Sequence, residues 1–208
     1  MIEQFKRALG TAGNCTRFFV YHLNREAAKG KFDKKPVGSA AEAKMTFVQA
    51  YAEAMRVRDT GQHATVGLWV TADSGLFFAD VDKMPQALTL DARGTEVMTM
   101  FPGAFAEWSV GKHGIHVVGT LAAPIPHGCK NDDLHLEFYT DGRGIALNID
   151  STPNGCMDSI HDATPLVTKY FAPRMPPTLP SNHVAASPAD GEGESELMPA
   201  AAARAKVA

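Results

Sequence analysis

Asp80 and Asp82 stand one residue apart at the end of an apolar run, in the segment LFFADVDK. In a β-strand, alternate side chains lie on the same face, so the two carboxylates project together while Val81 turns to the other face. Neighbouring carboxylates repel each other, and a divalent metal ion bound by their oxygens relieves that repulsion. A solvated strand end at a turn would accommodate the same pair. The pair alone therefore leaves a metal site and an exposed turn open.

A glycine-rich turn follows further along the chain, in the segment EWSVGKHGIHVVG. Gly111 and Gly114 flank Lys112 and a histidine, so the backbone can fold tightly and come close to a ligand. His116 begins the outgoing strand. A solvated turn followed by a structural histidine would explain the same residues. The other segments of the chain must decide between this interpretation and a ligand-binding turn.

A third segment, LHLEFYTDGRGIAL, places His135, Glu137 and Tyr139 on one face of a predicted strand. The Asp-Gly pair that follows is a turn signal, and Arg143 stands directly after it. An ordinary ion pair between Glu137 and Arg143 is the structural alternative for these two residues.

Taken together, the three segments favour a site for nucleotidyl transfer. The carboxylates of Asp80, Asp82 and Glu137 can bind two hard metal ions, which activate an attacking oxygen and stabilise a leaving one in phosphoryl transfer. The N–H groups of the glycine-rich turn, the ammonium of Lys112 and the guanidinium of Arg143 offer contacts for a triphosphate.

The elements that position these residues are predicted from hydrophobic periodicity. Strands are expected over residues 15–23, 66–70, 76–81, 104–121 with an internal turn, 134–139 and 144–147. The second and third of these are expected to form a hairpin through a turn at residues 72–75. A helix is predicted from Ser39 to Arg58, with Glu42 completing a capping box and an apolar stripe at Met45, Val48, Tyr51, Ala52 and Met55. A weaker helical pattern covers residues 85–100.

The 208 residues carry a net charge of −3, with a division along the chain. Residues 1–58 hold 11 basic residues against 5 acidic ones, and residues 59–172 hold 6 against 14. A basic part beside an acidic part suits a protein that grips an anion with one and holds cations with the other. Lys31, Lys34 and Lys35 crowd into the basic part.

Composition predicts one catalytic domain over residues 1–172 and a flexible tail or linker over residues 173–208, which is rich in proline, alanine and acidic residues. The chain has no apolar run of membrane-spanning length and no apolar leader, so no membrane partner is expected. Three widely spaced cysteines favour reduced thiols. A cytoplasmic location is therefore expected.

In their order and spacing, the three segments LFFADVDK, EWSVGKHGIHVVG and LHLEFYTDGRGIAL resemble the motifs of the archaeo-eukaryotic primase superfamily. They are most similar to the bifunctional primase-polymerase domains at the N-termini of phage and plasmid replication proteins. The resemblance spans residues 15–172. It implies an α+β fold in which packed helices back an RRM-like antiparallel sheet, joined to a small N-terminal α/β subdomain.

The resemblance also implies roles for single residues. Asp80, Asp82 and Glu137 would hold Mg²⁺ or Mn²⁺, and His116 would contact the phosphates of the incoming nucleotide. Lys112 and Arg143 would assist in nucleotide binding, and Lys31, Lys34 and Lys35 would meet the DNA. Many members carry a serine two residues before the histidine, where this chain has Gly114, so the earlier Ser109 is included as a nucleotide-binding candidate.

These expectations define a template-directed DNA primase and polymerase. It would make or extend primers on single-stranded DNA from NTP or dNTP, with a helicase domain or partner in phage or plasmid replication. One alternative is a rolling-circle replication initiator endonuclease, which needs paired histidines as His-x-His, whereas His113 and His116 are three apart. The other is a non-catalytic RRM-like module that binds single strands through aromatic residues such as Phe77, Trp108 and Phe138.

A structural zinc ion occurs in some relatives. His127, Cys129, His135 and the distant Cys156 are the available ligands here, without a Cys-x-x-Cys spacing. A structural zinc site is therefore not expected.

Overall fold

The computed structural model describes residues 1–26, 31–37 and 44–172. Residues Met1–Arg174 form one compact unit. The tail predicted for residues 173–208 lies outside the described residues, as do Ser39 and Glu42 of the predicted capping box. No helix in the described part of the chain is long and apolar enough to cross a membrane.

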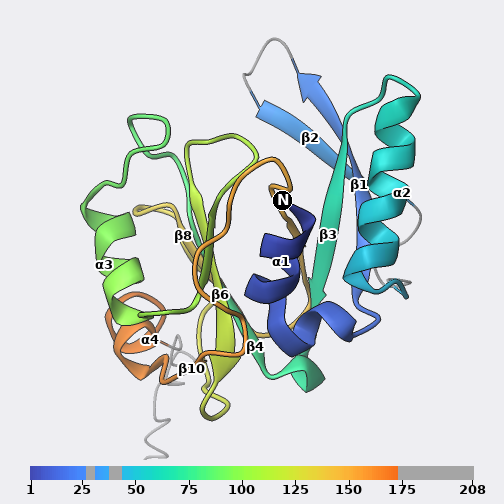
Figure 1. Ribbon diagram of the computed structural model, residues 1–208. Coiled ribbons are helices and arrows are strands. Elements are labelled where there is room, and N and C mark those ends of the chain that lie inside the picture. The colour runs from blue at the N-terminus through green and yellow to red at the C-terminus, as the bar shows by residue number, and fades with distance from the viewer. Residues whose placement is uncertain (27–30, 38–43, 173–208) are drawn as a thin grey trace, which may run out of the picture. The chain divides into compact units, whose positions relative to one another are not determined.

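The fold is α+β and contains two sheets that are antiparallel except at one short strand (Figure 1). The four-stranded sheet has the order β2 (Lys31–Pro36), β1 (Phe18–Glu26), β3 (Ala64–Val70) and β9 (Arg143–Ala146). The six-stranded sheet has the order β10 (Ile160–His161), β6 (Ile115–Leu121), β4 (Leu76–Val81), β8 (Leu136–Tyr139) and β7 (Lys130–Asn131), and β5 (Phe105–Trp108) also pairs with β6. Among the strands of the described residues, only β10 runs parallel to its neighbour.

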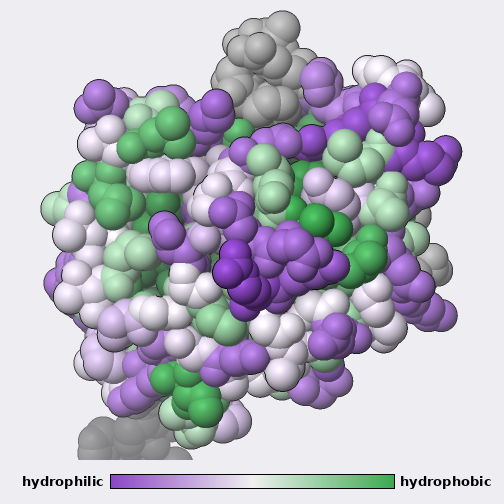
Figure 2. Space-filling view, in the orientation of Figure 1, coloured by the Kyte–Doolittle hydropathy of each residue, from purple (hydrophilic) through white to green (hydrophobic). Residues whose placement is uncertain are grey.

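The described part of the chain forms four α-helices that cover these sheets: α1 (Ile2–Leu9), α2 (Phe47–Asp59), α3 (Ala92–Met100) and α4 (Thr164–Tyr170). Helix α2 packs on β1 and β3, whereas α3 contacts β4, β6 and α4 (Figure 1). Helix α1 buries Phe5, Ala8 and Leu9, and its opposite face carries exposed polar side chains. Figure 2 shows hydrophilic side chains gathered over this helix.

The predicted hairpin between residues 66–70 and 76–81 is wrong, because β3 and β4 belong to different sheets. A 3₁₀ turn, η3 (Ala72–Ser74), and Gly75 at a φ of 66° redirect the chain from one sheet to the other. The chain crosses back between β8 and β9. The two crossings lie side by side, since the Ala72 N–H donates to Asp141 Oδ1 over 2.9 Å.

The apolar stripe predicted for the helix that ends at Arg58 is also wrong. Helix α2 begins after Thr46, whose side chain and that of Gln49 form the observed capping box. Its buried residues are Phe47, Ala50, Ala54 and Val57, whereas Met45 and Val48 are 36% and 46% exposed. The helix therefore presents a different face to the core than the predicted stripe. The strand, turn and strand predicted over residues 104–121 are confirmed by β5 and β6.

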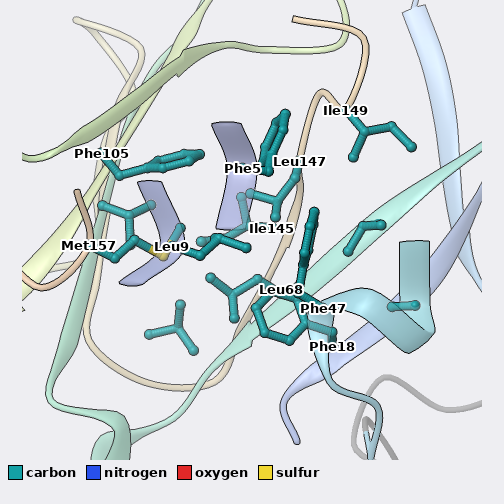
Figure 3. Packing of buried hydrophobic residues seen from close by; sticks show 14 of the residues in the cluster. Phe5, Leu9, Phe18, Phe47, Leu68, Phe105, Ile145, Leu147, Ile149 and Met157 are labelled. Carbon is teal, nitrogen blue, oxygen red and sulfur yellow. The ribbon is translucent and has the colours of Figure 1, made fainter. Parts of the chain in front are cut away.

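Two cores bury the opposite faces of the six-stranded sheet. The first joins that sheet to α1, α2 and the four-stranded sheet (Figure 3). Its aromatic centre includes Phe5 and Phe47, whose rings stack with centroids 5.7 Å apart. The second core lies under α3 and α4. The candidate site residues project from the face of the six-stranded sheet that the first core covers, as the strand register shows.

Candidate nucleotidyl-transfer site

Five polar residues stand directly opposite one another across the strands of the six-stranded sheet. Asp80 on β4 pairs with His116 on β6 and with Glu137 on β8. The same row continues to Glu107 on β5 and to Lys130 on β7. Residues that pair across strands share one face of a sheet. The register therefore places three of the predicted site residues on one face, in adjacent strands.

Asp80 is 9% exposed, and its Oδ1 is buried without a hydrogen-bond partner among the described residues. Burial, and then the charge of Asp82, raise the pKa of Asp80 to about 7, against the opposing charge of Lys34. The Asp82 N–H donates to the His135 carbonyl over 2.9 Å. Asp80 is thus a buried carboxylate with a like-charged neighbour and one oxygen without a partner among the described residues, which raises the free energy of its ionised form.

Glu137 is held by cations on both sides. Lys130 Nζ lies 2.9 Å from one of its carboxylate oxygens, and Arg143 donates to the other over 2.7 Å. The Tyr139 hydroxyl donates to that second oxygen over 3.0 Å. Burial acts to raise the pKa of Glu137, but the hydrogen bond from Lys130 and the charge of Arg143 outweigh it and hold the pKa below its usual value.

His116 is 3% exposed, and burial lowers its pKa to about 3. Its Nδ1 lies 3.0 Å from Oε1 of Glu107, a residue that sequence reasoning missed. The sequence did contain a sign that Glu107 is buried. Glu107 stands two residues after the apolar Phe105, so both side chains lie on the same inward face of the strand. His113 does not join this row, since its Nδ1 lies 3.0 Å from the Met84 carbonyl.

The turn between β5 and β6 closes next to Asp82. The Ser109 N–H donates to the Gly114 carbonyl over 2.8 Å, and Ser109 is 6% exposed. A Cβ on Gly114 would lie 2.8 Å from Asp82 Oδ1 and 3.3 Å from Ser109 Oγ. The structure therefore places Ser109 near Asp82, while Lys112 is exposed on the turn.

Backbone strain gathers at the same end of the site. Among the described residues, the non-glycine positions with positive φ are Lys83, Leu88, Lys112 and His135. Lys83 follows Asp82, the carbonyl of His135 accepts the Asp82 N–H, and the carbonyl of Lys112 accepts the Leu88 N–H over 2.9 Å. Such conformations cost about 1–3 kcal/mol each and cluster at functional sites. Three loops are thus fixed around Asp82.

The three predicted DNA-binding lysines do not share one location. Lys34 pairs with Leu23 across β2 and β1, on the face that also carries Phe19 and Tyr21, and its charge lowers the pKa of Asp80. Lys35 pairs with His22, so it lies on the opposite face of β2. Its Nζ is 3.3 Å from Asp33. The side chain of Lys31 lies outside the described residues.

Among the residues that the structure describes, no three His, Cys, Asp or Glu side chains meet in a ready-made metal cage. The donor set still fits a hard cation, because Asp80, Asp82 and Glu137 offer only oxygens and one of them is unpartnered. The zinc candidates are separated, with His127 Nε2 2.9 Å from Thr140 Oγ1 and Cys156 Sγ 3.7 Å from the Arg7 carbonyl.

No family model matches the chain, and no curated protein matches its sequence. The function of the protein is therefore inferred from its own residues. The geometry that bears on it is the row of polar side chains across the six-stranded sheet.

Proposed function

We propose that this protein is a template-directed nucleotidyltransferase, a primase-polymerase of archaeo-eukaryotic type. It would synthesise or extend primers on single-stranded DNA by two-metal phosphoryl transfer. One observation carries the proposal: Asp80, His116 and Glu137 are direct cross-strand partners. Their three sequence segments lie far apart in the chain, and strand pairing brings them side by side on one face of the sheet.

The topology of the six-stranded sheet supports an RRM-like catalytic core. Strands β8, β4, β6 and β5 lie side by side in this order, and α3 connects β4 to β5. In chain order these are the fourth, first, third and second strands, the arrangement expected of an RRM-like sheet. The four-stranded sheet with α2 would then be the N-terminal subdomain, although β9 joins it from later in the chain.

In this proposal Asp80, Asp82 and Glu137 hold Mg²⁺ or Mn²⁺. When bound, the ions supply Lewis-acid stabilisation of the charge that develops on the transferring phosphate. Glu137 would hold the ions in place of Lys130 and Arg143, and both cationic side chains would then be available to the triphosphate. The imidazole of His116 contacts the phosphates, and Lys34 adds positive charge from the four-stranded sheet.

Two observations disfavour the rival functions. A rolling-circle initiator would need two histidines on one strand face, but His113 bonds to Met84 in a turn while His116 lies on β6. A simple binding module has no use for three neighbouring carboxylates, because they repel phosphate. Of the three aromatic candidates for base stacking, Phe77 and Phe138 are fully buried in the second core, and Trp108 is partly buried against it.

The test is to incubate the protein with labelled nucleotides and Mn²⁺ on primed and on unprimed single-stranded templates. The proposal predicts labelled products complementary to the template, longer than the primer or formed without one. A covalent adduct between DNA and a tyrosine would instead identify an initiator. Retarded DNA with no new product would identify a binding module, and either result would refute the proposal.

A further inference from the structure

Glu107 is a fully buried carboxyl whose two oxygens are both bonded. Its side chain has 0% exposure. Oε1 lies 3.0 Å from His116 Nδ1, and Oε2 accepts the Asn148 N–H over 3.0 Å. The side-chain amide of Asn148 donates to the Trp108 carbonyl over 3.1 Å, which ties the end of β5 to the segment after β9.

Such a carboxyl is costly to place in a core. Burial of an acidic group costs several kcal/mol unless its bonds compensate, and an apolar residue of similar volume is often at least as stable. Burial accordingly raises the pKa of Glu107 well above its usual value. Among the described residues, no Lys or Arg side chain forms an ion pair with Glu107. Its contacts with His116 and Asn148 are what an apolar residue could not supply.

The contact with Glu107 determines which nitrogen of His116 is left for a ligand. An imidazole has two nitrogens, and the bond that one makes fixes the orientation of the other. Nδ1 is occupied by Glu107, and the ring packs edge-on against Phe78 with centroids 5.3 Å apart. Nε2 makes no hydrogen bond with any residue that the structure describes, and the neighbouring strand presents Asp80 directly opposite.

We infer that Glu107 is a positioning residue of the nucleotide site: it holds the imidazole of His116 through Nδ1, so that Nε2 faces the phosphates of the incoming nucleoside triphosphate. This inference rests on the proposed function, because the ligand is the triphosphate of that reaction. It assigns a role to a residue that touches neither the metals nor the substrate.

Two substitutions separate positioning from mere support of the fold. In Glu107→Gln, the amide can accept the Asn148 N–H and donate to His116 Nδ1, so both bonds survive. In Glu107→Met, the volume is kept and both bonds are lost. We expect Met to raise the KM for nucleotide on the order of 10-fold or more, with the KM for primer-template unchanged, because a misplaced contact group costs up to about 100-fold. Gln is expected to restore most of the affinity.

The matched control is Thr65→Val, which removes a buried hydrogen bond to the Leu147 carbonyl in the four-stranded sheet. It should lower the urea midpoint of unfolding and leave both KM values unchanged. Folded fractions of all variants are measured by circular dichroism. The inference is overturned if Met keeps the wild-type KM for nucleotide, or if Gln and Met are equally impaired. A wild-type protein that neither binds nor incorporates nucleotide overturns the proposed function, and this inference with it.

Discussion

Arg143 donates a 2.7 Å hydrogen bond to Glu137, although the two residues belong to different sheets. The guanidinium also lies 4.6 Å from the centre of the Tyr139 ring, and Lys130 approaches Glu137 from the other side. The proposed third metal ligand is thus paired with two cations in the structure. Because Glu137 would exchange Lys130 and Arg143 for metal ions, metal binding and nucleotide binding should be coupled.

Removal of either cation should make Glu137 easier for a metal to recruit. We expect Lys130→Ala and Arg143→Ala to tighten Mn²⁺ binding in the absence of nucleotide by about two- to five-fold, the value of a partly exposed ion pair. Arg143→Ala should also weaken nucleotide binding, because a bidentate phosphate contact is lost. Electron paramagnetic resonance of free Mn²⁺ measures the first effect. Weaker Mn²⁺ binding in both variants would contradict the exchange.

Lys34 and Lys35 offer a matched pair for locating the nucleic acid. Lys34 and Lys35 lie on opposite faces of β2, and the charge of Lys34 lowers the pKa of Asp80. Lys34→Ala should weaken binding of single-stranded DNA and lower the slope of log affinity against log salt by about 0.7, the value for one phosphate contact. Lys35→Ala should change neither. Equal losses in fluorescence anisotropy titrations would refute this assignment.

Gly114 is a position where a single methyl group should disturb the site. A Cβ there would lie 2.7 Å from the Val81 carbonyl and 2.8 Å from the Asp82 carboxylate. Gly114→Ala should lower kcat on the order of 10-fold or more, because it displaces a proposed metal ligand. At Gly111 the nearest atom to an added Cβ is 4.0 Å away, so Gly111→Ala is the control. Equal rates for the two variants in primer extension would count against the proposed role of Asp82.

Strand alternation allowed the pair Asp80 and Asp82 to be predicted on one face. The sequence could not place Glu137 opposite Asp80, because register depends on pairing between strands that are distant in the chain. Glu107 was missed for the same reason, since its partner His116 is identified only by the pairing of β5 with β6.

The wrong predictions were overturned by contacts between residues that are distant in the chain. The segment before Gly75 has the composition of a hairpin turn, but the interactions of Arg17 with Thr71 and with Asp73 anchor it to the four-stranded sheet while β4 enters the other one. Both Ser39-x-x-Glu42 and Thr46-x-x-Gln49 satisfy the capping-box pattern. Helix α2 begins at the second of these two boxes, where the tertiary packing buries Phe47.

The central claim is that Asp80 and Asp82 hold the metals of a nucleotidyl-transfer reaction. It is tested most directly by incorporation of a single labelled nucleotide on primed single-stranded DNA with Mn²⁺. The variants are Asp80→Asn and Asp82→Asn, and the control is Asp73→Asn, which alters an exposed aspartate paired with Arg17. The wild type and the control should extend the primer, and both site variants should lose about 100-fold or more in rate. Undiminished incorporation in the site variants, or none by the wild type, would contradict the claim.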